Sequence, residues 1–212
     1  GPCFSHDRGI ESWNEEASLI FKPLTGSEKI SMKFTTTVYS SQVDNWVLWL
    51  PVSSWSEPRN IRQVWARGVE ANLDGSLRFG QWYILLNAEY TWARSTTEQK
   101  ALGGDASLNK QLAYIPEHKF FINIYLKYRN FSMGYNHRFT GKVYTTSDNL
   151  EFLPPYHVGD FNFAKSFTVG KSGFRLQATA LNVWNEEYQV IEGYPNPGRS
   201  FKFTAYYEIN YQ

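Results

Sequence analysis

The sequence lacks the features that mark several large classes of protein. Its one cysteine, Cys3, excludes an internal disulfide and a cysteine-based metal cluster. No apolar run approaches the roughly 18 residues of a membrane helix, which excludes a helical membrane protein. The net charge is +1, from 21 Lys+Arg and 20 Asp+Glu. The sequence therefore lacks the excess of basic residues that is typical of nucleic-acid-binding proteins.

Aromatic residues, in contrast, are abundant. They make up 17% of the 212 residues, with 14 Tyr, 15 Phe and 8 Trp. Tyrosine and tryptophan favour membrane–water interfaces, and aromatic-rich chains suit sandwiches and barrels. The mean hydropathy of -0.47 is compatible with a membrane barrel, because lumen-facing positions dilute its apolar content.

The end of the chain has a strict period of two. Phe201, Phe203, Ala205, Tyr207, Ile209 and Tyr211 fall on one face, and Lys202, Thr204, Tyr206, Glu208 and Asn210 fall on the other. This alternation predicts a strand with one apolar and one polar face. A terminal amphipathic strand indicates a membrane β-barrel, since closure of the barrel leaves no strand edge unpaired in lipid.

The same alternation recurs along the chain and predicts about nine strands. They fall near residues 17–22, 30–39, 61–73, 82–92, 119–129, 131–140, 156–169, 174–183 and 201–212. Short turns are expected near residues 25, 75, 130 and 172, and long loops near 50, 100, 150 and 193. Short periplasmic turns alternating with long extracellular loops are typical of outer-membrane barrels.

The predicted barrel is incomplete. An odd strand count does not close a bacterial single-chain barrel, whose strands are even in number. The N-terminus lacks an initiator Met and a signal peptide, and Gly1-Pro2 resembles the scar of a cleaved expression tag. We therefore interpret the chain as a fragment.

Four segments carry a family resemblance. Residues 182–188 (Asn-Val-Trp-Asn-Glu-Glu-Tyr), followed by 194–201 (Tyr-Pro-Asn-Pro-Gly-Arg-Ser-Phe), resemble the closing signature of TonB-dependent outer-membrane receptors. Residues 39–46, 60–70 and 114–120 resemble the same family in the same order, so the resemblance covers nearly the whole chain from about Glu11. The final Asn210-Tyr211-Gln212 departs from it, because such barrels usually end on an aromatic residue.

The resemblance implies an all-β, antiparallel, plugged barrel of about 22 strands. Residues 1–212 would form its C-terminal portion, without the plug domain. The implied function is active transport of a scarce bulky solute across the bacterial outer membrane, energised through TonB. Residues 188–191 before Tyr194-Pro195 resemble vitamin B12 receptor-type members, so the expected cargo is cobalamin or a metal chelate. Expected partners are membrane lipid, the plug, TonB through the absent N-terminal part, and a surface lipoprotein.

The candidate ligand-binding residues are aromatic. Trp49, Trp55, Tyr188 and Tyr194 are predicted in long loops, where they would contact a bulky ligand by stacking and apolar burial. The alternative is that they form the interfacial girdle or pack the loops. No cofactor or metal is expected, because the histidines show no metal-ligand spacing.

Two other functions stay open at this point. The chain is either a segment that completes a wall with another chain, or an outer-membrane barrel hydrolase with a Ser–His pair on adjacent strands. We expect no enzyme, because Gly-x-Ser-x-Gly and His-Glu-x-x-His motifs are absent from the sequence.

Overall fold

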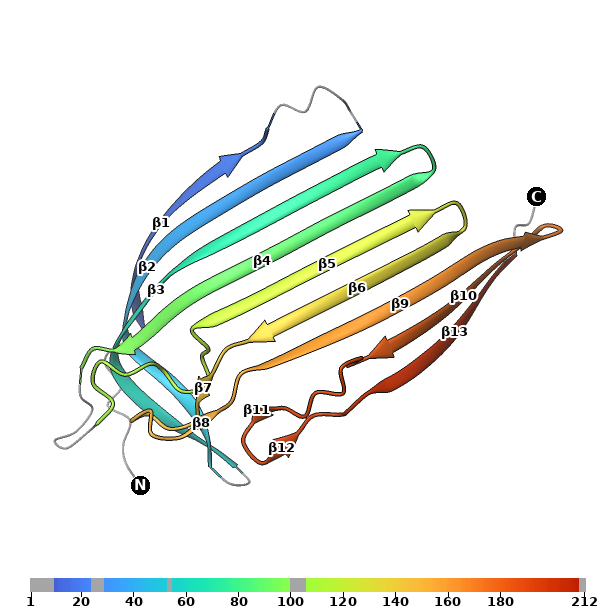
Figure 1. The fold of residues 1–212 in the computed structure, drawn as a ribbon. Helices are drawn as coiled ribbons and strands as arrows, with labels where there is room; N and C mark the ends of the chain where they lie inside the picture. Colours follow the sequence, from blue (N-terminus) through green and yellow to red (C-terminus); the bar gives the residue numbers. More distant parts are fainter. Residues whose placement is uncertain (1–9, 24–28, 53–54, 100–105, 210–212) are drawn as a thin grey trace.

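A single antiparallel sheet dominates the computed structural model, which describes residues 10–23, 29–52, 55–99 and 106–209. Its order is β1-β2-β3-β4-β5-β6-β9-β10-β13 (Figure 1). The strands are β1 (Glu11–Phe21), β2 (Ile30–Val52), β3 (Trp55–Phe79), β4 (Trp82–Thr97), β5 (His118–Tyr128), β6 (Phe131–Thr140), β9 (Tyr156–Val169), β10 (Ser172–Leu181) and β13 (Ser200–Ile209). The predicted all-β class is confirmed, and the main sheet has the nine strands expected.

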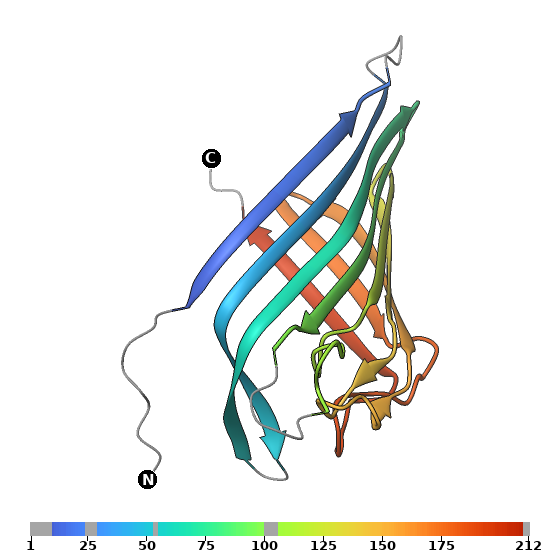
Figure 2. The ribbon, with the colours of Figure 1, turned by 90° about the vertical axis from the view of Figure 1, so that its left-hand side faces the viewer.

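The sheet is a curved wall with two edges. Figure 2 shows it bending so that β1 and the last strands face each other across an open concave side. Strands β1 and β13 are the edges of the described sheet. In this part of the chain, no helix is long and apolar enough to span a membrane.

The register joins like residues across the strands. On one face Ile30 lies opposite Leu77, which lies opposite Ile84. Many large side chains on this apolar face are exposed, as for Phe203 (82%) and Ile30 (46%), and others such as Leu77 are half-buried, whereas Ser132 on the other face is only 9% exposed. Because side chains converge on the concave side of a curved sheet, the sheltered polar face is the interior and the apolar face is the convex exterior.

Hydrogen-bonded polar side chains cross the interior face. The side-chain amide of Asn87 donates to Asp74 Oδ1 (2.9 Å), and that of Asn123 donates to Asn136. The next residue in this row is Asp160, opposite Asn136 in β9. The polar interior expected of such a barrel is therefore present.

The segment at residues 40–59 corrects the sequence analysis, which expected a long loop there. Strands β2 and β3 instead pair continuously as far as Val52 opposite Trp55. Pro51 and Pro58 favoured a loop, because proline lacks the N–H that a ladder needs. The hairpin extends beyond β1 and β4, which pair only with the parts of β2 and β3 farther from its tip. Both prolines thus lie beyond the pairing of β1 and β4 in the described sheet, where an edge strand tolerates a missing donor.

The predicted turn near residue 75 was also misplaced. Strand β3 continues to Phe79, and the turn follows at Gly80, where φ is 58°. Asp74 and Gly75 favour turns in isolation. In the sheet, however, Asp74 lies between Lys33 and Asn87 and accepts a hydrogen bond from Asn87.

The long connections gather at one end of the sheet, and the short turns lie at the other (Figure 1). The long connections contain the short hairpins β7 (Val143–Tyr144) with β8 (Phe152–Leu153) and β11 (Gln189–Ile191) with β12 (Tyr194–Pro195). Much of the buried apolar core lies in them, including Leu112 (4% exposed) and Ala113 (2%). The loops are therefore packed structures that shape the mouth of the wall.

Candidate functional site

One asparagine braces the last long connection, residues 182–199. Asn182 has φ of 48° and is 4% exposed. Its side-chain amide donates to the carbonyl oxygens of Glu186 (2.9 Å) and Pro197 (3.3 Å), and its Oδ1 accepts from the Glu186 N–H (2.9 Å). Asparagine tolerates the left-handed backbone better than most residues. Asn182 thus holds the outgoing and returning arms of the loop together.

A second asparagine closes the same loop. Asn185, with φ of 55°, accepts a hydrogen bond at its Oδ1 from the Arg199 N–H (2.9 Å). A Cβ on Gly198 would lie 3.0 Å from this Oδ1, so glycine allows the close approach. The stretch that carries the family resemblance is therefore, in its contacts, a loop-folding motif.

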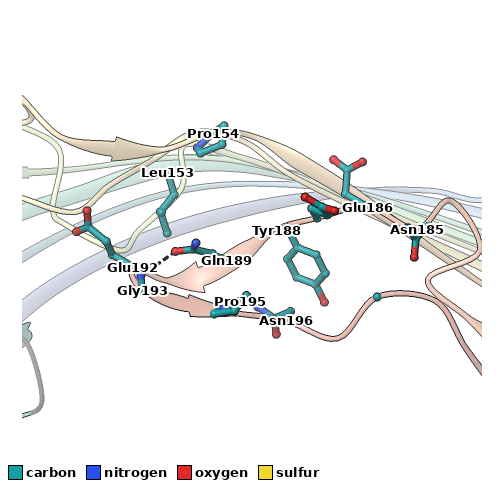
Figure 3. A pocket seen from close by; sticks show the side chains of 12 residues that line it. Leu153, Pro154, Asn185, Glu186, Tyr188, Gln189, Glu192, Gly193, Pro195 and Asn196 are labelled. Atoms are coloured by element: carbon teal, nitrogen blue, oxygen red, sulfur yellow. Dashed lines mark hydrogen bonds between the residues drawn. The ribbon is translucent and has the colours of Figure 1, made fainter.

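The braced loop borders a cavity of about 750 Å³, shown in Figure 3. Its lining residues are Leu153, Pro154, Asn185, Glu186, Glu187, Tyr188, Gln189, Glu192, Gly193, Pro195, Asn196 and Gly198. The volume lies within the usual range of ligand pockets, about 300–1,000 Å³. This cavity is the candidate binding site.

Tyr188 is the candidate residue that the structure brings to the cavity. Its ring stacks on Tyr156 with centroids 4.5 Å apart, and its carbonyl oxygen accepts from the Asn196 N–H (3.0 Å). Burial, with a further contribution from Tyr156, raises the pKa of the Tyr188 phenol. The hydroxyl therefore stays neutral at physiological pH and is available as a hydrogen-bond donor.

The other three candidates lie elsewhere. Tyr194 lies in β12, is 57% exposed and is outside the cavity lining. Trp49 lies in β2 opposite Pro58, and Trp55 lies in β3 opposite Val52, so both are strand rather than loop residues. The side chains of both tryptophans fall outside the described part of the chain. Their role in binding stays a prediction.

Acidic residues of the cavity were not among the predicted ligand-binding residues. Glu186, Glu187 and Glu192 all line it, and Glu186 Oε2 lies 3.6 Å from His157 Nε2. Among the described residues, no group of three or more His, Cys, Asp or Glu side chains is placed to hold a metal ion.

The sequence does contain a signal for the braced loop. Asn182 and Asn185 are three residues apart, and asparagine is a residue type that favours left-handed turns.

Aromatic side chains border the convex face at two levels. Trp82 and Tyr128 stack near the short turns, with centroids 4.5 Å apart. Trp92 lies ten residues from Trp82 in β4, on the same face. At about 3.3 Å per residue and a tilt of about 40°, the two levels are roughly 25 Å apart, the height of the apolar band of an outer-membrane barrel. The fold is thus part of the wall of a transmembrane β-barrel.

Comparison with known proteins identifies the family. Residues 10–183 match the family described as TonB dependent receptor-like, beta-barrel. The chain belongs to this family, which consists of outer-membrane receptors of Gram-negative bacteria.

Solved structures show the same fold. The ferric preacinetobactin receptor BauA from Acinetobacter baumannii is 14% identical, with a TM-score of 0.70 over 93% of this chain and 29% of that one. The siderophore receptor PiuA from Acinetobacter baumannii is 17% identical, with a TM-score of 0.67 over 93% of this chain and 28% of that one. The copper transporter OprC is 16% identical, with a TM-score of 0.66 over 98% of this chain and 32% of that one. The chain thus spans about a third of their length or less.

Proposed function

We propose that residues 1–212 form the C-terminal part of the barrel wall of a receptor that imports a scarce bulky solute. The cargo is a metal complex or cobalamin, and TonB supplies the energy through a plug domain. The cavity beside Tyr188, at the long-loop end of a polar interior wall, carries the proposal. Several similar structures are named as receptors for iron chelates or as a copper transporter, which favours a metal complex.

The cavity lining suggests the charge of the cargo. Glu186, Glu187 and Glu192 contribute negative charge, and no lysine or arginine is among the lining residues of the described chain. Complementary potentials favour binding and like charges oppose it. A neutral or cationic complex therefore suits this wall better than an anionic chelate. The Tyr188 ring would supply apolar contact and its hydroxyl a hydrogen bond.

The interior wall suits passage of a hydrated solute. Its asparagine side chains bind one another, as in the contact of Asn123 with Asn136. Such neutral, mutually paired groups hold a passing ligand less tightly than bare charges would. Trp49, Trp55 and Tyr194 stay candidates for contacts with the cargo at the extracellular end of the barrel. A surface lipoprotein stays a candidate partner.

The test is binding and uptake by the complete receptor that carries this sequence. Cells producing it are given a labelled metal complex or labelled cobalamin, with and without functional TonB. We expect TonB-dependent uptake of one of them, and about tenfold weaker binding after Tyr188→Ala, as for loss of one good stacking contact. Tyr206→Ala, in β13 and outside the cavity lining, is the control. TonB-independent entry, or binding unaffected by Tyr188→Ala, would contradict the proposal.

The contacts of the described histidines do not favour the alternative of a barrel hydrolase. In the described part of the chain, His118 Nδ1 binds the Tyr90 hydroxyl (2.9 Å) and His137 Nδ1 binds the Tyr135 hydroxyl (3.0 Å). His157 faces Glu186. These contacts lend no support to a Ser–His hydrolase.

A further inference from the structure

The convex face carries a trough along β10. Ala178 lies opposite Phe163 of β9 and Phe203 of β13, and its neighbour on the same face, Ala180, lies opposite Phe161 and Phe201. Each alanine is therefore flanked on both sides by a phenylalanine. Because a methyl group projects much less than a phenyl ring, the alanines form the floor and the phenylalanines form the walls.

A cavity of about 300 Å³ occupies part of this trough. On the convex face it is lined by Phe163, Leu176, Ala178, Phe203 and Ala205. The walls are open to the surroundings, with Phe163 40% and Phe203 82% exposed. In the membrane this surface meets lipid, so a narrow apolar channel along the strand suits one extended acyl chain.

A lysine stands at one end of the trough. Lys165 lies two residues from Phe163 in β9, opposite Leu176 and Phe131, and therefore on the convex face. It is exposed, and its Nζ lies 4.9 Å from the centroid of the Phe131 ring. No carboxylate of the described residues forms an ion pair with it. A cation on the lipid-facing side of a barrel is unfavourable unless it reaches the polar boundary.

The direction of the Lys165 side chain meets that condition. Lys165 is five residues from the short turn at Gly170, but its Nζ lies over the ring of Phe131, which directly follows the short turn after Tyr128. Short turns lie on the periplasmic side of such barrels. The ammonium group therefore reaches toward the phosphates of the periplasmic leaflet. Beyond it, the Ser172 and Tyr207 hydroxyls, 3.1 Å apart, add hydrogen-bonding groups at the same end.

We propose that Lys165 and the trough over Ala178 and Ala180 form a binding site for one anionic glycerophospholipid of the periplasmic leaflet. The phosphate binds at Lys165, and one acyl chain lies in the trough between the phenylalanines. The charge of Lys165 and the direction of the trough, from that lysine toward the membrane centre, select this lipid. The site lies outside the wall and is separate from solute binding.

Native mass spectrometry of the complete receptor, titrated with dipalmitoyl phosphatidylglycerol, tests this proposal. We expect one retained lipid per receptor. Lys165→Gln should weaken binding about fivefold, the effect of one lysine near a phosphate surface. Ala178→Leu, which fills the floor of the trough, should remove the retained lipid. Dipalmitoylglycerol, which has the same chains and no phosphate, should bind as weakly as the lipid binds to Lys165→Gln.

Two matched variants separate a site from general lipid contact. Lys127→Gln removes a cation next to Tyr128 on the interior face, and Ala88→Leu fills a convex position between Leu73 and Ile122. Both control variants should retain the lipid. Heat-modifiable migration in SDS gels checks that every variant is folded. The proposal is overturned if Lys165→Gln binds phosphatidylglycerol as tightly as the wild type does, or if dipalmitoylglycerol binds as well as phosphatidylglycerol. It is also overturned if the two control variants lose as much lipid as Lys165→Gln and Ala178→Leu do.

Discussion

Gln111 and Asn149 exchange two hydrogen bonds across two different loops. Asn149 Oδ1 accepts from the Gln111 N–H (2.9 Å), and the Asn149 side-chain amide donates to the Gln111 carbonyl oxygen (2.8 Å). The Gln111 side chain continues the chain of contacts, since its Oε1 accepts from the Ser95 N–H (2.9 Å). The end of β4 and both loops are thereby joined into one frame at the mouth of the wall.

Removing the Asn149 side chain should loosen this frame. Asn149→Ala leaves the Gln111 N–H and carbonyl groups without partners at a residue that is 5% exposed. We expect a loss of about 1–3 kcal/mol in local stability, seen as faster hydrogen exchange of the Gln111 amide. Asn149 has φ of 61°, so Asn149→Gly is the comparison that removes the bonds without backbone strain. Unchanged exchange in Asn149→Gly would show that the bonds contribute nothing.

The two functions of the Asn182 amide are separable by substitution. Asn182→Asp keeps an acceptor for the Glu186 N–H but loses the donor to the Glu186 and Pro197 carbonyl oxygens. We expect proteolysis of residues 186–197 to accelerate in Asn182→Asp and more strongly in Asn182→Ala, by about fivefold or more for a loss of at least 1 kcal/mol. Asn196→Ala, which leaves the Asn196 N–H to Tyr188 bond intact, is the control. Equal cleavage rates in all three would rule out the brace.

Substituting alanine for each of two glycines of β3 should change the stability of the barrel differently. A Cβ on Gly68 would lie 2.6 Å from the Tyr39 hydroxyl oxygen and press on the Trp92 carbonyl oxygen, whereas the nearest atom to a Cβ on Gly75 is 3.7 Å away. We expect Gly68→Ala to lower the free energy of unfolding by about 1–3 kcal/mol through overpacking. Gly75→Ala should be neutral or stabilise by up to about 1 kcal/mol. Unfolding midpoints of the complete barrel in urea measure both, and equal midpoints would contradict the packing argument.

The loop around Asp148 should lose order in acid. Hydrogen bonds from the Thr146 hydroxyl (2.6 Å) and the Leu150 N–H (3.1 Å), with a smaller contribution from Lys110, lower the pKa of Asp148. A carboxyl whose pKa is lower in the folded state stabilises that state above its unfolded pKa, near 4, and loses the contribution as pH falls through the folded pKa. The exchange rate of the Leu150 amide, divided by its intrinsic rate at each pH, should rise below about pH 4. Asp148→Asn should remove this pH dependence, and a rise that persists in this variant would assign it to another group.

The binding residues show where prediction from sequence stops. Tyr188 and Tyr194 lie in the same loop and are both aromatic, yet Tyr188 stacks on Tyr156 at the cavity and Tyr194 is exposed. Their separation depends on the backbone path that Asn182 and Asn185 impose. That path needs contacts between residues more than ten positions apart, which no periodic pattern records.

The sequence by itself determined the antiparallel all-β class, the two faces of the strands and the family. These follow from a period of two and from short local motifs, both of which are readable along the chain. Tertiary structure decided the long β2–β3 hairpin, the turn at Gly80, the place of the cavity and the trough beside Lys165. Each of these depends on which residue lies opposite which, and that register is set by neighbouring strands and by loop contacts rather than by local preference.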